Sequence, residues 1–452
     1  MKRFITTLGL ILFPFTLSSL SAQTIQTRQT AKVVAIKAGR LIDVRHGNVI
    51  SDAVILIERG MITAVGKDLI IPSGASVIDL SNATVMPGLI DCHTHLLNSF
   101  DSDLDDDQNM IRIVSQMSTA SRALLGASLA REVLEAGFTT VRDVGNSGIN
   151  GDIALRDAIK AGWVRGPRIL ASTRALSPLG GQFGQLSPDA QKIIEQEYVA
   201  ISGVEEARRA VRQAIYDGAD LIKVIVGVGP RLLSLEEMKV IVEEAHRADR
   251  RVAAHAVDNQ TARIAAEAGV DSIEHAYTIS DDVLKLMAEK HIFLVPTDGT
   301  VESYLETGDM TPEQYKQAAV FKKAFVERNQ QRLKRAINAG VRIAAGSDVY
   351  YRRPKKTRGQ ASFRMFRAYA ASGMSTIEVI RTATLNAAEL LGMSERLGSV
   401  EVGRFADIIA IAEDPLSDTT ALEHAGFVMK GGIVVLDRLT KGANHNSLTD
   451  SH

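Results

Sequence analysis

Eight short apolar segments that end in polar residues alternate with stretches of helical periodicity through the middle of the chain. The stretches between them, such as SLEEMKVIVEEAHRA, repeat apolar residues at the spacing of a helix packed on one face. Parallel strands need such crossovers, so the pattern predicts the α/β class and a (β/α)8 TIM-type barrel, whose chemistry lies at the carboxyl ends of its strands. An open doubly wound sheet is the alternative, but no Gly-rich phosphate-binding fingerprint follows an early strand. The eight segments are LIDCHTH, TTVRDVG, RILAST, DLIKVIV, RVAAHA, SIEHA, IFLVPTD and RIAAGSD.

Short β-rich runs separated by turn residues lie on both sides of this region. They include VVAIKAGRLID and SVIDLSNATVMPG before it, and GSVEVGRFADIIAIAEDP and FVMKGGIVVLD after it. This pattern is typical of antiparallel strands. We therefore predict one small β-sandwich domain formed from both ends of the chain, by residues 23–88 and 398–440. The barrel is expected at residues 89–397, and residues 441–452 are expected to form a tail.

The first residues, MKRFITTLGLILFPFTLSSLSAQ, have the layout of a secretory signal peptide, with a cationic start, an apolar run and small residues. The apolar run from Phe4 to Phe15 is interrupted and short for a membrane span, so an uncleaved anchor is the weaker alternative. We expect residues 1–22 to be removed and the protein to be exported, periplasmic or secreted. The only cysteine, Cys92, excludes an intrachain disulfide.

Two of the ten histidines, His93 and His95, end the first predicted strand. Alternate residues of a strand share a face, so both imidazoles can hold one cation, and imidazole nitrogen suits zinc. A single His-x-His pair is weak support, because a histidine at a strand end is more often a hydrogen-bonded structural residue. Agreement across several strands strengthens the interpretation, since all of these side chains are expected at one mouth of the barrel. The other members of the set are Lys223 in the fourth strand, His255 in the fifth, His275 in the sixth and Asp348 in the eighth.

Lys223 is unusual in this set because an ammonium repels a metal cation. Burial and neighbouring cations both disfavour the charged form of a lysine. Its neutral amine can then add carbon dioxide and become a carbamate, an anionic ligand able to bridge two metals. The alternative is a lysine whose stem packs while its head reaches solvent, but apolar residues flank it on both sides in ADLIKVIV.

These motifs together resemble the amidohydrolase superfamily, and specifically its binuclear branch with a carboxylated lysine. The resemblance rests on PGLIDCHTH, the IK pair, AAHA, IEHA and GSD. SLEEMKVIVEEAHRADRRVAAHA, AGVDSIEHA and VGRFADIIAI resemble the group of prolidase-like and Xaa-Arg/Lys dipeptidases, with imidazolonepropionase as a more distant relative. The likeness covers nearly the whole chain after the signal peptide, from about Val33 to Asp437.

The resemblance implies two divalent metal ions, expected to be Zn²⁺. It places His93, His95 and Asp348 on one ion, places His255 and His275 on the other, and makes the CO2-derived carbamate on Lys223 the bridge. Mononuclear deaminases of this barrel type lack the bridging lysine, so the ligand set favours hydrolysis over base deamination.

The activity implied by the resemblance is that of a metal-dependent amidohydrolase. It is expected to cleave the amide bond of a dipeptide or N-acyl amino acid with a hydroxide that bridges the two metals. Asp348 is the expected catalytic proton shuttle, which takes a proton from the water and passes it to the departing amine. Pure metal ligation is the alternative role of Asp348, and the two roles can coexist.

Substrate contacts are expected from the loops that follow the strands. The carboxylate of a dipeptide or N-acyl amino acid needs a cationic partner, which an arginine supplies through two parallel hydrogen bonds. A solvated basic loop is the alternative for residues 352–358. The candidates are Arg231, Arg352, Arg353 and Arg358.

Gln182 is a further expected contact, and it marks a departure from the family. Many relatives have a histidine at this position, and relatives that accept proline dipeptides tend to have a tyrosine near the fourth strand, where Val224 and Ile225 follow Lys223. Both differences weaken the case for proline specificity. The alternative substrate is a cyclic or xenobiotic amide of the imidazolonepropionase or ochratoxin type. A catalytically silent binding protein is disfavoured, because a decayed site is expected to lose at least one ligand.

The formal net charge of −1 gives no basic surface for nucleic acid or an anionic membrane. We therefore expect no nucleic-acid partner and no stable membrane insertion. The expected partners are a small-molecule amide or dipeptide substrate and further copies of this chain in a homo-oligomer.

Overall fold

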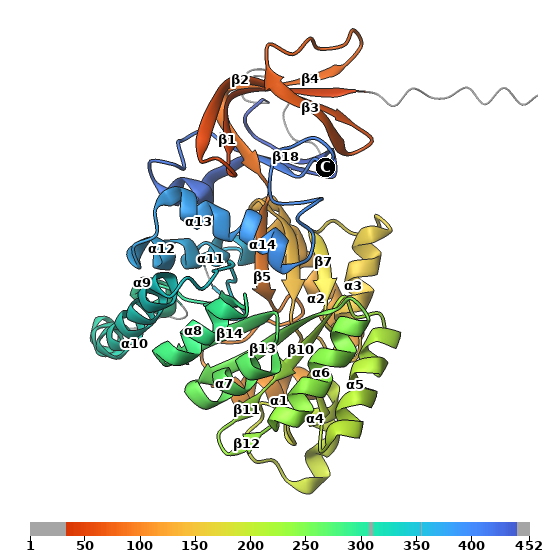
Figure 1. Cartoon of the computed structure of the whole chain (residues 1–452), viewed down its shortest axis with the longest axis vertical. Coiled ribbons are helices and arrows are strands. Elements are labelled where there is room, and N and C mark those ends of the chain that lie inside the picture. The colour runs from red at the N-terminus through yellow and green to blue at the C-terminus, as the bar shows by residue number, and fades with distance from the viewer. Residues whose placement is uncertain (1–32, 307–310, 354, 441–452) are drawn as a thin grey trace, which may run out of the picture. The chain divides into compact units, whose positions relative to one another are not determined.

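The computed structural model describes residues 33–306, 311–353 and 355–440 of the chain (Figure 1). The predicted signal peptide and the predicted tail lie outside these residues. Among the described helices, none combines the length and the apolar character that crossing a membrane requires.

Seven of the barrel strands are present as parallel neighbours. β5, β6 and β7 pair in one sheet, and β10, β13, β14 and β15 pair in a second sheet that also contains two shorter strands. The bounds are β5 (Leu89–Thr94), β6 (Phe138–Asp143), β7 (Arg168–Ala171), β10 (Leu221–Ile225), β13 (Arg251–Asp258), β14 (Ser272–Thr278) and β15 (Phe293–Val295), and the shorter strands are β8 (Ala175–Ser177) and β9 (Tyr198–Ala200). β11 (Gly227–Val228) and β12 (Arg231–Leu232) form a separate hairpin.

Backbone hydrogen bonds close these two sheets into a ring. Between β7 and β10, the Asp220 amide donates to the Ala171 carbonyl at 2.8 Å. The eighth segment, residues 342–348, takes its place between β15 and β5. The Leu294 amide donates to the Arg342 carbonyl at 2.9 Å, and the Cys92 amide donates to the Ala345 carbonyl at 2.8 Å. The predicted (β/α)8 barrel is therefore confirmed.

Amphipathic helices with capped ends cover the barrel. α6 begins at a capping box in which the Ser234 side chain accepts from the Glu237 amide, and Asp258 caps α7 in the same way. Figure 1 shows α5, α6 and α7 outside β10 and β13. The helices are α1 (Asp106–Gln116), α2 (Thr119–Glu135), α3 (Gly151–Lys160), α4 (Gln191–Glu197), α5 (Val204–Tyr216), α6 (Leu235–Arg247), α7 (Asn259–Ala268), α8 (Asp281–Glu289), α9 (Val301–Leu305), α10 (Pro312–Asn338), α11 (Arg358–Ser362), α12 (Arg364–Ala371), α13 (Thr376–Thr382) and α14 (Leu385–Leu390).

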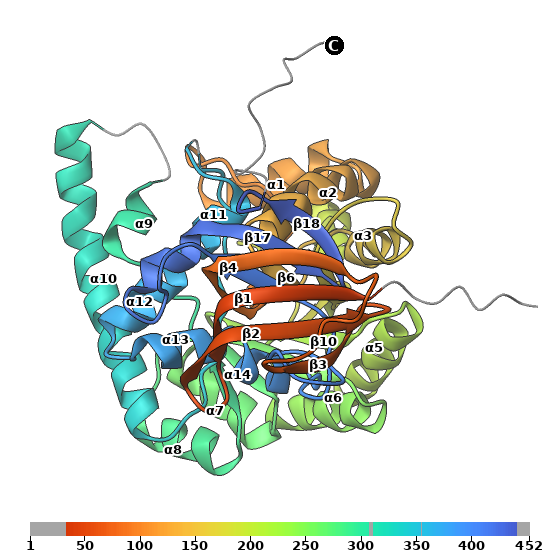
Figure 2. The same cartoon turned by 90° about the horizontal axis from the view of Figure 1, so that it is seen from above.

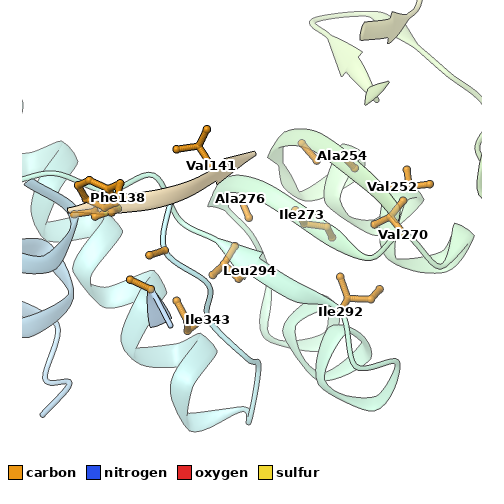
Figure 3. Close-up of a cluster of buried hydrophobic side chains, with 14 of the residues drawn as sticks. Phe138, Val141, Val252, Ala254, Val270, Ile273, Ala276, Ile292, Leu294 and Ile343 are labelled. Atoms are coloured by element: carbon orange, nitrogen blue, oxygen red, sulfur yellow. The ribbon is translucent and has the colours of Figure 1, made fainter. Parts of the chain in front are cut away.

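The core of the barrel unit is a continuous cluster of buried aliphatic and aromatic side chains. Figure 3 shows part of it, with Val141 of β6, Ile273 of β14 and Leu294 of β15. Ile343 of the eighth segment lies beside Leu294, to which it also forms a parallel bridge. This burial is the main term that stabilises the barrel, because apolar area is removed from water on every strand.

Strands from both ends of the chain make the β domain. In its sheet the order is β18-β17-β16-β4-β1-β2-β3, so β4 lies between the early strand β1 and the late strand β16. Figure 2 shows these strands side by side. The predicted domain from both chain ends is thus confirmed, and one hydrogen-bonded sheet carries all seven strands. The bounds are β1 (Val34–Asp43), β2 (Asn48–Glu58), β3 (Met61–Lys67), β4 (Ser76–Pro87), β16 (Ile408–Ile411), β17 (Ala425–Lys430) and β18 (Ile433–Asp437).

A buried ion pair ties the loops at the mouth of the barrel to α2 and α4. Arg122 bonds the carboxylate of Glu197, and both side chains are almost fully buried. We expect Glu197→Ala to lower the free energy of unfolding by about 3–5 kcal/mol, because it leaves the Arg122 charge buried without its partner. Denaturant titration measures this loss. Glu135→Ala, which removes the exposed pair with Arg131, should change stability by less than about 1 kcal/mol, and equal losses for the two variants would contradict the prediction.

Candidate active site

The six side chains that the sequence placed at one barrel mouth do meet there. They line a single cavity of about 170 Å³, called the site cavity below, together with Gln182, Tyr198 and Tyr350. The ring centroids of His93 and His95 lie 5.3 Å apart, and those of His255 and His275 lie 4.6 Å apart. The fold therefore brings residues from five different strands to within contact of one another. They are His93, His95, Lys223, His255, His275 and Asp348.

Asp348 lies at the centre of this group. Its Oδ1 is 3.7 Å from Nε2 of His93 and 3.5 Å from Nε2 of His95. Its Oδ2 is 3.9 Å from Nδ1 of His275. One ligand atom from each of His93, His95 and Asp348 lies within 4.8 Å of the others, which is close enough for the three to hold one cation.

Each of three histidines has its Nδ1 engaged by a group outside the cavity. Nδ1 of His93 lies 2.7 Å from the Glu274 carboxylate, and Nδ1 of His95 lies 2.9 Å from the Gly145 carbonyl. Nδ1 of His275 lies 2.8 Å from Oγ1 of Thr297. Such contacts fix the ring orientation and leave Nε2 as the atom available to a cation.

The electrostatics of the site favour neutral imidazoles and an ionised Asp348. Burial and the nearby charge of Lys223 together lower the pKa of His93 to about 4 and that of His255 to about 3. Burial and the neighbouring His255 lower the pKa of His275 well below its usual value. Burial alone would raise the pKa of Asp348, but His93 and His95 bring it down to about 2. Neutral imidazole and carboxylate are the forms that bind metal ions.

Lys223 lines the site cavity together with the four histidines. It is almost fully buried, and burial lowers the pKa of its ammonium to about 8 despite the opposing charge of Glu274. A larger neutral fraction than that of an ordinary lysine is therefore available near neutral pH, as expected from the sequence.

Glu274 and Arg142 support the site from beneath, and the sequence reasoning missed both. Glu274 accepts from Nη2 of Arg142 at 2.8 Å and faces His93 on its other oxygen. Burial opposes ionisation of Glu274, but Arg142 and His93 hold its pKa below the usual range. The sequence could have pointed to both residues, because each is a charged residue inside a strand that is otherwise buried. Glu274 lies in IEHA and Arg142 lies in TTVRDVG.

The backbone is strained where two of these residues sit. His275 has a φ of 72° and Asp348 a φ of 49°, values that residues with a Cβ rarely adopt. Neighbouring strands hold this conformation, for example through the Asp348 amide, which donates to the His93 carbonyl at 2.9 Å. Strain of this kind concentrates at functional sites, where the surrounding structure fixes the side-chain direction.

None of the four candidate arginines lines the site cavity. Arg231 donates to the carbonyls of Leu179 and Phe183, so it braces the loop after the third strand. Arg352 is exposed. Arg358 is buried and donates to main-chain carbonyls of the first-strand loop, including that of Asn98 at 2.6 Å. Nearby carbonyls or solvent take up the guanidinium groups of Arg231, Arg352 and Arg358, and substrate contact by these three stays a prediction.

Gln182 and Arg353 lie nearer the chemistry. The Gln182 amide nitrogen is 3.4 Å from Nε2 of His255, and its carbonyl oxygen accepts from the Tyr198 hydroxyl at 3.0 Å. Gln182 therefore occupies one wall of the site cavity. Arg353 lines a second pocket that adjoins Asp348.

Comparisons with known proteins agree with this geometry. Residues 84–435 match the model of the amidohydrolase family. Ochratoxinase of Aspergillus niger is 33% identical over 441 residues, which cover 90% of this chain and 88% of that protein. Imidazolonepropionase of Fusobacterium nucleatum is 24% identical, with 85% of this chain and 91% of that protein covered.

Solved structures give the same result. The structure of a Xaa-Pro dipeptidase with methionine bound in its active site superimposes with a TM-score of 0.75 at 30% identity, covering 89% of this chain and 99% of that one. The family model spans more than half of the chain, and it includes every one of the six residues of the site. The chain therefore belongs to the amidohydrolase family and is an amide-bond hydrolase.

Proposed function

We propose that the protein hydrolyses the amide bond of a dipeptide or an N-acyl amino acid, with two zinc ions held by the six site residues. The observation that carries the proposal is Lys223, a buried lysine surrounded by four histidines and Asp348. Burial disfavours its ammonium, although Glu274 and Asp348 oppose this effect, whereas a carbamate at this position would be an anionic ligand between two groups of donors.

The donor set fits two metal ions. His93, His95 and Asp348 form one triad of ligand atoms, and the adjacent rings of His255 and His275 supply a second group. His93, His255 and His275 favour the neutral form, and Asp348 favours the ionised form. Nitrogen and oxygen donors in this combination suit a borderline ion such as zinc.

The carbamate would form from the neutral amine of Lys223. The Nζ lone pair forms a bond to the carbon of CO2 while one C–O π bond breaks and leaves its electrons on oxygen. One proton passes from Nζ to water, so the side chain ends as an anion. A lowered pKa makes the required neutral amine available.

When bound, the two metal ions lower the pKa of a water molecule and polarise the amide carbonyl. Asp348 contributes the acid–base part of the reaction. Its carboxylate is ionised at neutral pH, so it accepts the proton that the attacking water loses and delivers this proton to the departing amine nitrogen. Protonation at this step is essential because an unprotonated amine leaves poorly.

A cyclic or xenobiotic amide is the second candidate substrate, and the similarity to imidazolonepropionase and ochratoxinase favours it. The two candidates share the same bond chemistry and differ in the group that the loops must accommodate. Export of the protein stays a proposal that rests on the N-terminal sequence alone.

The test is a screen of dipeptides, N-acyl amino acids and neutral ring amides with zinc-loaded protein. We expect two equivalents of zinc per chain, loss of activity after chelation and recovery when zinc is added. Turnover restricted to substrates with a free carboxylate supports the first candidate, and turnover of neutral ring amides supports the second. Less than one equivalent of metal after saturation would overturn the proposal.

The support beneath His93 gives a further expected result. Glu274→Gln keeps the shape of the side chain but removes the charge that faces Nδ1 of His93. We expect metal affinity to fall roughly 10- to 100-fold, which is typical when the partner of a ligating histidine is lost. Competition with a zinc chelator measures the affinity. Glu267→Gln, an exposed position on α7, is the matched control and should leave the affinity unchanged.

A further inference from the structure

A second pocket, called the aromatic pocket below, opens beside Asp348 on the side of α9 and α10. It has a volume of about 360 Å³, against about 170 Å³ for the site cavity. The two share Asp106, Asp348 and Tyr350, so they meet at the proposed proton shuttle. The aromatic pocket therefore has room for the larger part of a substrate, whereas the site cavity does not.

Three aromatic rings form one wall of the aromatic pocket. Phe325 of α10 contacts Tyr277 and Tyr304 edge to face, with ring centroids 5.2 Å and 5.6 Å apart. All three rings are partly exposed to the pocket. The Tyr277 hydroxyl lies 3.2 Å from Oγ1 of Thr297, the residue that also holds His275, so this wall is continuous with the site.

Three cationic side chains face the same space. Arg364 lies over the Tyr304 ring, with its Cζ 5.1 Å from the ring centroid, and Lys322 lies over the same ring at 5.4 Å. Arg353 lines the pocket and donates to the Ser303 carbonyl. Among the described residues, none of the three cations has a carboxylate within 4.0 Å. The neighbouring Glu306 is paired with Lys356 instead.

Arg364 offers a prepared donor for an anion. Its Nε donates to the carbonyl of Ser347, and its Nη2 donates to the carbonyls of Ser347 and Asp348. These bonds and the contact with Tyr304 fix the plane of the guanidinium. Within the described part of the chain, Nη1 has no hydrogen-bond partner. An arginine held in this way binds a carboxylate with little loss of side-chain entropy.

We infer that the aromatic pocket binds the leaving amino acid of the substrate, with its carboxylate on Arg364 and an aromatic side chain against Tyr304 and Phe325. The inference rests on the proposed function, because it uses the role of Asp348. The departing amine receives its proton from Asp348, so the residue that carries this amine must lie next to Asp348. The aromatic pocket is the larger space that adjoins this carboxylate.

The charge of the pocket also excludes some substrates. The three cations Arg353, Arg364 and Lys322 outnumber the two carboxylates of the pocket, those of Asp106 and Asp348. They repel a basic side chain, so a C-terminal lysine or arginine is disfavoured. The preferred substrates are therefore dipeptides or N-acyl amino acids that end in phenylalanine, tyrosine or tryptophan with a free carboxylate.

The first test compares Ala-Phe with Ala-Phe amide, Ala-Gly and Ala-Lys on zinc-loaded protein. We expect kcat/KM for Ala-Phe to exceed that for the amide by roughly 10- to 100-fold, because a charge-assisted hydrogen bond is lost. The value for Ala-Lys should be lower still, and Ala-Gly should fall about tenfold or more below Ala-Phe.

Variants assign the effect to the pocket. Arg364→Gln should raise KM for Ala-Phe roughly 10- to 100-fold with a much smaller change in kcat. Arg367→Gln, on the same helix and paired with Glu423, is its control. Phe325→Ala should remove most of the preference for Ala-Phe over Ala-Gly, and Phe321→Ala, exposed on the same helix, should leave it intact. Arg364 also donates to the Asp348 carbonyl, so Arg364→Gln could change the position of Asp348. The comparison of Phe325→Ala with Phe321→Ala does not involve this contact and tests the pocket separately.

Calorimetry with L-phenylalanine and L-phenylalaninamide separates this inference from the proposed function. Binding of phenylalanine that Arg364→Gln weakens, without turnover of any dipeptide or N-acyl amino acid, supports the pocket and overturns the proposed function. If kcat/KM changes neither with C-terminal amidation of the substrate nor with Phe325→Ala, the inferred role of the aromatic pocket is wrong and the proposed function remains supported.

Discussion

Replacing Lys223 with alanine is expected to lower the rate of hydrolysis at least about 10³-fold. The proposed carbamate bridge holds both metal ions, and these ions lower the activation free energy by several kcal/mol. The metal content should fall together with the rate, from two equivalents per chain to one or fewer. The fold should persist, since the substitution also removes a buried titratable group whose charged form burial disfavours. Metal analysis, circular dichroism and steady-state kinetics on the same preparation measure all three properties.

The control for this variant is Lys239→Ala, an exposed lysine on α6. It should change neither the metal content nor the rate. A small carboxylic acid added to Lys223→Ala should restore part of the activity, because it can supply the missing anionic oxygens in the space left by the side chain. Full metal content and full activity in Lys223→Ala would contradict the proposed role.

Asp348→Asn is expected to separate metal binding from catalysis. The amide keeps an oxygen donor toward His93 and His95 but cannot take up and return a proton. We expect kcat to fall roughly 10²- to 10⁴-fold, the range of a lost general acid–base group, while at least one metal ion is retained. Substrates with poor leaving amines should be affected most, because they depend most on protonation.

A series of anilides with leaving groups of different basicity measures this dependence. Asp249→Asn is a suitable control, because Asp249 is exposed, precedes β13 and lies away from the site cavity. It also has a positive φ of 54°, a conformation that asparagine tolerates. An unchanged rate in Asp348→Asn would show that the residue serves only as a ligand.

The positions of the proposed ligands followed from the sequence because barrel strands impose strict rules. Residues two apart in a strand share a face, which placed His93 beside His95, and parallel strands present their carboxyl ends at one mouth. The same rules located His255, His275 and Asp348 without any knowledge of the loops. The site cavity that the six residues line has the composition that this reasoning implied.

The loop arginines could not be placed by such rules. Arg358 is buried because main-chain carbonyls of a loop 260 residues earlier accept its hydrogen bonds, a contact that no local pattern encodes. Arg364 was missed for the same reason, since it lies at the start of a helix and reaches the site through carbonyls of Ser347 and Asp348. Glu274 differs from these arginines, because its place inside a buried strand was a readable signal.

The order of strands in the β domain also has a consequence for how the protein is made. β4 pairs with β16 from Thr84–Ile411 to Pro87–Ile408, so one edge of β4 stays bare until the last strands leave the ribosome. An unpaired edge is a template for pairing with another chain. A chain that ends before β16 is therefore expected to aggregate instead of folding, because the edge of β4 that β16 covers stays unpaired.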